Sequence, residues 1–288
     1  MIVGIGFVFG VILNVFLIGL LYLVNDKIIS LTEIERAISI PVLGSIPSSG
    51  VESRTLFHIV DHPRSMVSES IRSLRTNLDF FTSGMDRKVI VVSSTVSGEG
   101  KSFLAMNLGG VLSLSNKKVM LIDLDMRKAK DISNFKNNDR SKGISTILIR
   151  KNKWTECVSP TGLANFDFIS SGPTPPNPAE LLMSPEFEQL LNDLKSNYDF
   201  VVIDTPPIGL VADGLMAVRL ADLSIYIFRA NYSQRDYLNS LQRLIEINKL
   251  KNIAIVLNAI PASSKAYGYG YYEDKEMQKS LWRKILRV

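Results

Sequence analysis

The sequence predicts an α/β fold in which helices cover both faces of a mostly parallel sheet, preceded by one transmembrane helix. From residue 88 onward, short apolar runs alternate with helical patterns, as expected of parallel strands joined by crossover helices. A separate apolar run, residues 2–24, carries no charge and precedes this alternating part. Parallel sheets bind ligands at the carboxyl ends of their strands, so we expect the functional residues where the apolar runs end.

The composition excludes several classes of protein. With 46% hydrophobic residues, the 288-residue chain can build a core and is not a disordered protein. Its single cysteine, Cys157, has no partner for an intramolecular disulfide, and with only His58 and His62 there is no cluster with zinc spacing. The net charge of +5 is mild and forms no long basic block. We therefore expect no nucleic-acid partner.

Residues 2–24 predict a transmembrane helix. As a helix they would span about 34 Å, enough to cross a bilayer core of roughly 30 Å. A signal peptide would place basic residues before a shorter apolar stretch, whereas only Met1 precedes this one. Lys27 and Arg36 are too few to set its orientation by charge. The expected organisation is a transmembrane helix over 1–25, a juxtamembrane linker over 26–55, a folded domain over 56–262 and a C-terminal tail over 263–288.

The alternating part resolves into strands and helices in order. Residues 40–50 come first and carry the proline and glycine punctuation of a linker with a short extended stretch. The predicted strands are 88–93, 119–124, 166–171, 200–204, 223–228 and 253–257, and the predicted helices are 102–114, 178–197, 211–220 and 236–250.

The first predicted strand of the alternating part runs into a glycine-containing loop and then a helix, which is the context of a phosphate-binding loop. Gly98 and Gly100 allow consecutive N–H groups to face one point, and the helix N-terminus adds partial positive charge. Lys101 would reach the β- and γ-phosphates, and Ser102 would coordinate Mg²⁺. The pattern G-x-x-x-x-G-K-[ST] is not complete, because Thr95 stands at its first glycine. The residues expected to hold a nucleotide are Ser97, Gly98, Glu99, Gly100, Lys101, Ser102 and Phe103.

Carboxylates end two of the predicted strands. Asp123 and Asp125 stand where one strand runs out, and Asp204 ends another just before two prolines. Each acid alone could simply cap a helix. Beside a phosphate loop, however, three carboxylates predict a magnesium-nucleotide site, because Mg²⁺ takes oxygen ligands. The candidate catalytic residues are Lys101, Asp123, Asp125 and Asp204, and the candidate metal ligands are Ser102 and the same three aspartates.

Together these motifs resemble those of the bacterial tyrosine kinases that control capsule and exopolysaccharide assembly. A Walker A loop, an apolar-Asp-x-Asp-x-Arg motif and a Walker B strand occur in that family's order, at 98–102, 123–127 and 201–204. The resemblance covers nearly all of residues 25–272. It implies a P-loop NTPase-like fold, ATP and Mg²⁺ as cofactors, and phosphoryl transfer to tyrosine. It also implies that Asp123 accepts the phenol proton, with metal binding as the competing role.

Two further segments carry the resemblance. Glu69, Arg72 and Arg75 match a family motif on one helical face that closes a ring of subunits, although they could also pair with one another in water. The proline-rich stretch 172–184 looks like the family's loop before a helix. The partners that the resemblance implies are other copies of the chain in a ring, the membrane, and the polysaccharide polymerase or export machinery. It also places the kinase domain in the cytoplasm, at the bacterial inner membrane.

Four tyrosines lie close together after the last predicted strand. Interleaved glycines favour a flexible tail whose phenols can extend into an active site, although the stretch could also be no more than a sticky aromatic tail. The resemblance assigns these tyrosines as phosphoacceptors that a neighbouring subunit phosphorylates. Phosphates on adjacent tails would then repel one another and open the ring. The four residues are Tyr267, Tyr269, Tyr271 and Tyr272.

Two other functions fit the same motifs. A partition-type ATPase shares the loop and both aspartate strands, but such enzymes usually carry a second lysine early in the loop, where this chain has Ser94, Thr95 and Val96. A non-catalytic scaffold could bind nucleotide only to assemble a ring that regulates polysaccharide length. The sequence does not separate this scaffold from a kinase, because the same pocket serves both.

Overall fold

The computed structural model describes residues 10–16, 19, 26–48, 56–81, 88–127, 139–209 and 213–261. The strands are β1 (Val42–Pro47), β2 (Lys88–Ser94), β3 (Val119–Asp123), β4 (Val158–Pro160), β5 (Phe166–Ile169), β6 (Phe200–Asp204), β7 (Leu223–Arg229) and β8 (Ile253–Ile260). The helices are α2 (Leu31–Ala37), α3 (His58–Asp61), α4 (Met66–Phe81), α5 (Lys101–Leu114), α6 (Ile144–Leu148), α7 (Pro178–Leu182), α8 (Pro185–Asn197), α9 (Asp213–Leu220) and α10 (Asp236–Asn248).

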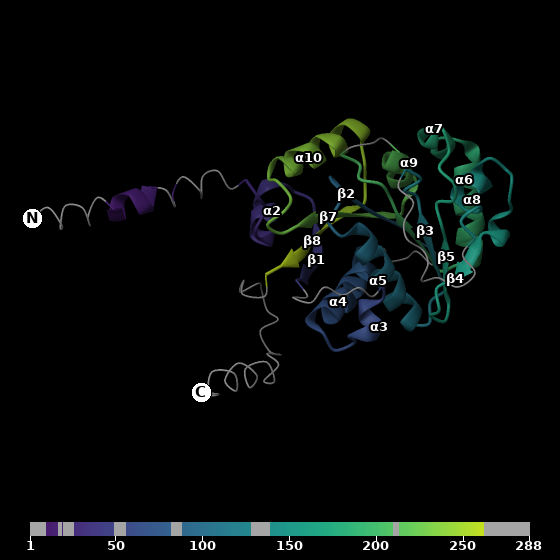
Figure 1. Cartoon of the computed structure of the whole chain (residues 1–288), viewed down its shortest axis with the longest axis horizontal. Helices are drawn as coiled ribbons and strands as arrows, with labels where there is room; N and C mark the ends of the chain where they lie inside the picture. Colours follow the sequence, from purple (N-terminus) through teal and green to yellow (C-terminus); the bar gives the residue numbers. More distant parts are fainter. Residues whose placement is uncertain are drawn as a thin grey trace, which may run out of the picture.

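A single eight-stranded sheet runs through the molecule in the order β1-β8-β7-β2-β6-β3-β5-β4 (Figure 1). Every neighbouring pair is parallel except β4 with β5, which is antiparallel. The mostly parallel sheet expected from the alternating pattern is therefore confirmed. The three central strands β2, β6 and β3 are buried along their whole length, which explains why each reads as a continuous apolar run.

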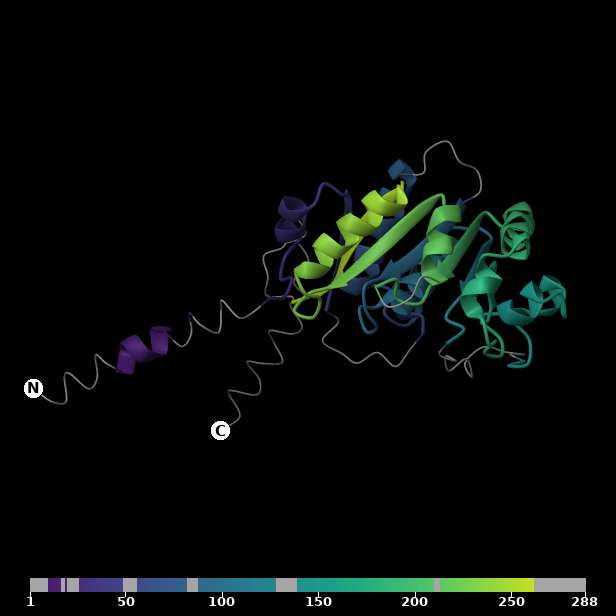
Figure 2. The same cartoon turned by 90° about the horizontal axis from the view of Figure 1, so that it is seen from above.

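Helices cover both faces of the sheet, as Figure 1 and Figure 2 show from two directions. Successive side chains of a strand point to opposite faces, so each strand feeds two cores. Val89 and Val91 of β2 pack in one core with α2, α6, α8, α9 and α10. Ile90 and Val92 pack in the other with α3, α4 and α5. The molecule is thus a three-layer α/β/α arrangement.

The expected linker differs from what the structure shows over residues 26–48, which belong to the folded domain. β1 pairs with β8 in parallel, and Asn77 Nδ2 of α4 donates a hydrogen bond to Leu43 O at 2.8 Å. Ile28 and Ile34 are fully buried. The prolines and glycine of this segment read as punctuation, but an edge strand tolerates them because only one of its sides forms a ladder.

Other elements also differ from expectation, and the short helices α2, α3 and α6 have no counterpart among the predicted helices. The helix expected over 178–197 is two helices, because Pro185 has no N–H to donate and opens α8 after Ser184 as N-cap. β4 has no counterpart among the predicted strands, since it is three residues long and ends in Pro160. The remaining predicted strands and helices agree with the structure to within a few residues at each end.

The two ends of the chain fall largely outside the described residues. Within 2–24 only residues 10–16 and 19 are described, and 10–16 are helical. No helix in the described ranges is both long enough and apolar enough to span a bilayer. The transmembrane helix therefore stays a prediction. The tail beyond residue 261, with Tyr267, Tyr269, Tyr271 and Tyr272, also lies outside the described residues.

Candidate active site

The sheet brings the predicted acids to one place. Strands β2, β6 and β3 are neighbours, so their carboxyl ends meet at one edge. Asp204 lies opposite Val92 of β2 in one ladder and opposite Asp123 of β3 in the other. Both aspartates are buried, and Asp123 Oδ1 accepts the N–H of Asp125 at 3.0 Å, which fixes the turn just after β3. Asp204 therefore ends the strand next to β2, from which the phosphate loop leaves, and Asp123 ends the strand beyond it.

The loop between β2 and α5 has the backbone shape that its glycines predict. Gly98 and Gly100 have φ values of 88° and 105°, in the left-handed region that favours glycine. A Cβ on Gly100 would also lie 2.1 Å from Nδ2 of Asn258, so space as well as φ requires glycine there. Lys101 opens α5, and its ammonium donates to Ser94 Oγ at 3.0 Å. The lysine thus lies back over its own loop, where phosphate oxygens would be bound.

The other predicted nucleotide residues occupy the loop and the first turn of α5. Ser97 and Gly98 are exposed at the crest of the loop, while the side chain of Glu99 is buried beneath it. Ser102 and Phe103 are half-buried in the first helical turn. The crest therefore offers backbone N–H groups to solvent next to a helix N-terminus.

Thr95 occupies the position where the usual pattern has glycine, and a partner outside the motif accommodates it. Its hydroxyl lies 3.0 Å from the hydroxyl of Tyr226, which comes from the neighbouring strand β7, and both side chains are buried. Burial raises the pKa of the Tyr226 phenol, so the phenol stays protonated and remains a hydrogen-bond donor. The threonine is thus a satisfied buried hydroxyl and not a defect in the loop.

A second group of residues holds the loop from outside, and the sequence analysis missed it. Arg229 donates to the carbonyl of Gly98, and Tyr232 donates to the carbonyl of Ser97, both at 2.9 Å. Arg229 ends β7 and Tyr232 lies in the turn between β7 and α10, more than 130 positions from the loop along the chain. From the end of β8, Asn258 Nδ2 donates to the carbonyl of Glu99 at 2.9 Å. No motif marks these positions in the sequence.

The donor set suits Mg²⁺ bound mainly through nucleotide and water. The described residues include no compact group of three or more His, Cys, Asp or Glu side chains that would hold a metal by themselves. Mg²⁺ bound to nucleotides typically takes one or two protein carboxylates together with phosphate and water oxygens. A serine at the start of α5 and buried carboxylates at two strand ends fit that arrangement, so Ser102, Asp123, Asp125 and Asp204 remain the predicted ligands.

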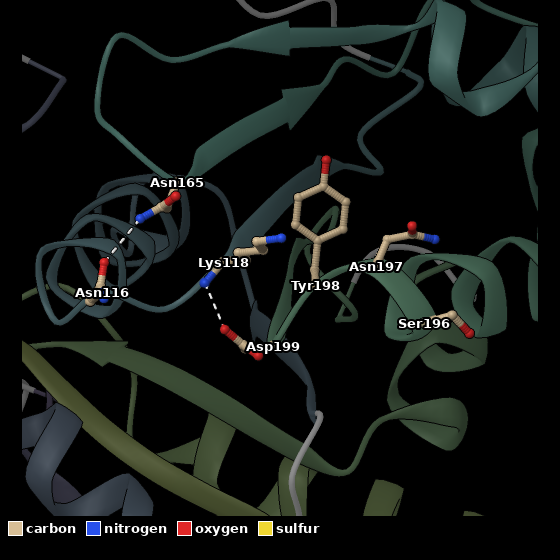
Figure 3. Close-up of a pocket in the computed structure, with 7 residues that line it drawn as sticks. All are labelled: Asn116, Lys118, Asn165, Ser196, Asn197, Tyr198 and Asp199. Carbon is tan, nitrogen blue, oxygen red and sulfur yellow. Dashed lines mark hydrogen bonds between the residues drawn. The ribbon is translucent and has the colours of Figure 1, made fainter.

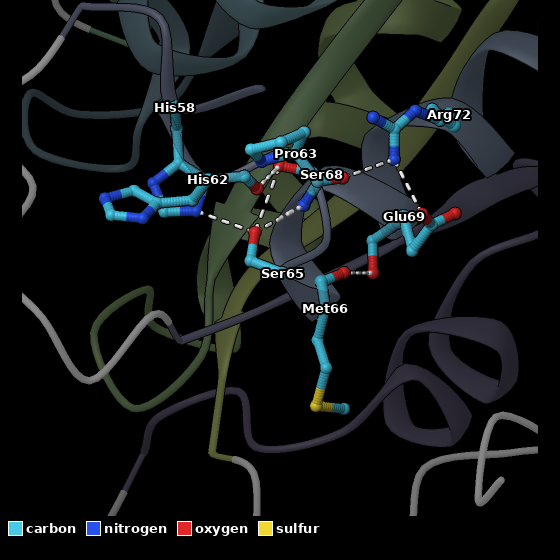
Figure 4. Close-up of polar contacts among 9 residues, drawn as sticks. His58, His62, Pro63, Ser65, Met66, Ser68, Glu69 and Arg72 are labelled. Carbon is cyan, nitrogen blue, oxygen red and sulfur yellow. Dashed lines mark hydrogen bonds and ion pairs between the residues drawn. The ribbon is translucent and has the colours of Figure 1, made fainter. Parts of the chain in front are cut away.

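Two of the three predicted interface residues pair with each other within the subunit. Arg72 Nη1 donates to Glu69 Oε1 at 2.6 Å and to the carbonyl of Pro63 at 2.8 Å, and both side chains are partly exposed (Figure 4). Arg75 donates instead to Ser115 at the end of α5. The two arginines thus bind groups of their own subunit, and a role between subunits stays a prediction.

A hydrogen-bonded network of polar side chains at the start of α4 includes the buried His58. His58 Nε2 lies 2.9 Å from Ser65 Oγ, whose own proton goes to Ser68 Oγ, so Nε2 is the donor in this pair (Figure 4). Its Nδ1 has no hydrogen-bond partner among the described residues. Burial, and then the nearby His62, lower the pKa of His58.

A cavity of about 450 Å³ lies at the opposite end of the sheet (Figure 3). Its lining residues stand just before the amino ends of β3, β5 and β6, away from the phosphate loop, and none of them is a predicted site residue. We therefore do not assign the nucleotide to this cavity. The lining residues are Asn116, Lys118, Asn165, Ser196, Asn197, Tyr198 and Asp199.

Known proteins with similar sequences also carry a nucleotide-dependent activity of the kind that the phosphate loop predicts. Residues 87–255 match the family described as AAA domain. The tyrosine-protein kinase wzc of Salmonella typhi is 38% identical over 216 residues, which are 74% of this chain and 30% of that protein. The putative tyrosine-protein kinase CapB of Staphylococcus aureus is 32% identical over 217 residues, 75% of this chain and 94% of that protein.

A solved structure agrees with these relatives. The kinase domain of the Escherichia coli tyrosine kinase ETK has a TM-score of 0.75 and 29% identity, and the match covers 85% of this chain and all of that domain. The chain spans less than a third of wzc but nearly the whole of CapB. With its phosphate loop, its paired aspartate strands and these relatives, the chain belongs to the bacterial tyrosine-protein kinase family.

Proposed function

We propose that the chain is an ATP-dependent tyrosine autokinase that phosphorylates its own C-terminal tyrosines. One observation carries the proposal: Asp123 and Asp204 stand side by side at the carboxyl ends of β3 and β6, and β6 neighbours the strand that leads into the phosphate loop. Carboxylates, a lysine and loop N–H groups at the same edge of the sheet are the groups expected to bind a triphosphate with its Mg²⁺. The absence of a second lysine early in the loop supports a kinase over a partition-type ATPase.

The residues would share the work of phosphoryl transfer. The Lys101 ammonium and the loop N–H groups stabilise negative charge on the transferred phosphate, and Ser102 with the aspartates holds the cation. Mg²⁺, when bound, neutralises charge between the β- and γ-phosphates. As the phenol oxygen forms a bond to the γ-phosphorus, the bond to the bridging oxygen breaks and ADP leaves. Asp123 accepts the phenol proton.

The acceptor tyrosines belong to another subunit in this proposal. Tyr267, Tyr269, Tyr271 and Tyr272 of one chain extend into the site of the next within a ring, to which Glu69, Arg72 and Arg75 contribute. Phosphates crowded on the tails repel one another and favour dissociation of the ring. Through this cycle the chain, anchored by its predicted membrane helix, regulates the assembly and export of a capsular or extracellular polysaccharide.

Incubation of the purified protein with labelled ATP and Mg²⁺, followed by phosphotyrosine detection, tests the activity. We expect incorporation that Lys101→Met abolishes and that Lys118→Met, a lysine at the opposite end of the sheet, leaves unchanged. Mixing Lys101→Met, which keeps its tyrosines, with an active chain whose four tail tyrosines are phenylalanine tests transfer between subunits. Label on the Lys101→Met chain supports it. Nucleotide binding with no Lys101-dependent phosphotyrosine would reject the kinase in favour of a scaffold.

A further inference from the structure

The side chain of Glu99 points away from the place where a nucleotide would bind. It is 0% exposed although it belongs to the phosphate loop, and a buried carboxylate needs hydrogen-bond partners. Its Oε2 accepts the backbone N–H of Val96, three positions earlier in the same loop, at 2.8 Å. Its Oε1 accepts the hydroxyl of Ser233. The carboxylate thus closes residues 96–99 into a small ring on the underside of the loop.

The hydrogen bonds around Ser233 leave its hydroxyl proton for Glu99. Ser233 Oγ accepts the N–H of Arg229 at 2.8 Å, and its own N–H donates to the carbonyl of Arg229 at 2.9 Å. The Ser233 carbonyl accepts the N–H of Ile28 at 2.9 Å. Ser233 is 0% exposed, so no solvent competes for it. A hydroxyl whose oxygen already accepts a hydrogen bond gives its single proton to the carboxylate beside it.

The turn that carries Ser233 is well fixed. Asn231 N–H donates to the carbonyl of Ile28, and Arg235 N–H donates to the carbonyl of Asp26, both at 2.8 Å. Arg235 also forms an ion pair with Glu33 of α2 at 2.5 Å. Compared with the contacts that Arg229 and Tyr232 make to the loop carbonyls, the contact of Ser233 with Glu99 is the buried one. A buried hydrogen bond to a charged group contributes more than an exposed one.

We propose that Glu99 and Ser233 are positioning residues that set the curvature of the phosphate loop, so that its N–H groups face the nucleotide phosphates. The proposal rests on the proposed function, because it assumes that the loop binds a nucleotide. Neither side chain touches the phosphates; both act through the backbone of residues 96–99.

The charges around the pair fit this role. A carboxylate aimed at the phosphates would repel them, whereas here it is turned under the loop and Lys101 stands on the nucleotide side. Burial is the largest influence on the Glu99 carboxyl and raises its pKa, while the hydrogen bonds from Ser233, Val96 and Ser94 and the Lys101 charge partly oppose that rise. The hydrogen bonds from Ser233 and Val96 therefore offset part of the cost of burying the carboxylate that accepts them.

Two single variants and their combination test the pair. Glu99→Gln keeps the shape but turns an NH₂ group toward the Ser233 hydroxyl, so two donors face each other. Ser233→Ala removes the donor and leaves one carboxylate oxygen without it. We expect the Kd for MgADP, measured by titration calorimetry, to rise about tenfold in each. The double variant removes the clash of donors, so its Kd should rise by clearly less than the product of the two single effects.

Ser224→Ala is the matched control, because Ser224 is also a buried serine and lies near the start of β7, whereas Ser233 lies in the turn after the other end of that strand. We expect it to leave the Kd unchanged. In kinase assays the pair should change the KM for ATP more than kcat, since no catalytic group is lost. At a temperature where all variants are folded, an unchanged Kd in both single variants would overturn the proposal, as would strictly multiplicative effects in the double variant. Failure of the unaltered protein to bind MgADP would instead reject the nucleotide site itself.

Discussion

Asp123 and Asp204 face each other across the ladder of β3 and β6, at the last position of both strands. The next residues after each leave the sheet, so the two carboxylates mark the edge where ligands of parallel sheets bind. β2 lies on the other side of β6 and ends two positions beyond Val92, the residue opposite Asp204. The relationship follows from strand order and does not depend on any loop.

We expect Asp204→Asn to reduce phosphotyrosine formation about 100-fold or more, because the carboxylate charge at the strand end is lost while its size is kept. A 100-fold loss corresponds to roughly 2.7 kcal/mol of transition-state stabilisation. Asp199→Asn is the control: this residue precedes the other end of the same strand, and its carbonyl-type oxygen can still accept from the N–H of Lys118. Comparable losses in both variants would mean that the strand, and not its carboxyl end, matters.

Tyr226→Phe is expected to lower the free energy of unfolding by about 1–3 kcal/mol, because it leaves the buried Thr95 hydroxyl without its partner. Urea denaturation followed by circular dichroism measures this. Combining it with Thr95→Val removes both polar groups, and we expect most of the lost stability to return. If the free energy of unfolding of the double variant falls by the sum of the two single decreases, the hydroxyls do not stabilise the fold as a pair.

Acidification should destabilise the protein through His58. Its pKa is lowered in the folded state, so between that value and its ordinary value of 6.5 the unfolded chain binds more protons and stability rises with pH. The contribution is present above pH 6.5 and is lost as the pH falls through the lowered pKa. Urea midpoints measured from pH 7.5 down to pH 5 should fall for the unaltered protein and less steeply for His58→Gln.

His62→Gln provides the comparison for that series. His62 is exposed and contributes the second cause of the lowered pKa, after burial. We expect this variant to keep most of the pH dependence. An identical slope for His58→Gln and the unaltered protein would show that other groups dominate the acid response.

Gly109→Ala should be destabilising although alanine favours helix. A Cβ at this position of α5 would lie 2.5 Å from the ring of Phe166 in β5. Forcing a well-packed ring to move typically costs 1–3 kcal/mol, which exceeds the gain of about 1 kcal/mol in helix propensity. Thermal unfolding of Gly109→Ala with and without Phe166→Leu checks the cause. The smaller side chain should relieve the clash, and no relief would place the strain elsewhere.

Much of the fold and the centre of the site could be predicted because their signals are local. Strands such as β6 are short apolar runs bounded by polar residues, and Asp204 at its end is read from the same few positions. The phosphate loop likewise has its glycines and Lys101 within four residues. Local patterns therefore fixed the inner strands and the groups expected around a nucleotide.

The remaining features could not be predicted because they depend on contacts between distant segments. Tyr232 forms a hydrogen bond with Ser97, 135 positions away, and Ser233 forms one with Glu99, 134 positions away. No local pattern in either segment predicts these contacts. Thr95 reads as a departure from its motif until Tyr226 is placed beside it. β1 could not be predicted as a strand because prolines stand at its two ends, and only its pairing with β8 shows that the segment belongs to the sheet.

That pairing has a further consequence. β8 lies between β1 and β7, so a protein begun at residue 56 would leave the backbone groups along one side of β8 bare, together with the apolar surface that Leu43 and Ile46 now cover. The unpaired backbone groups of such an edge strand can pair with strands of other chains and cause aggregation. The residues directly after the predicted membrane helix thus cover a sheet edge through which a protein begun at residue 56 is expected to self-associate.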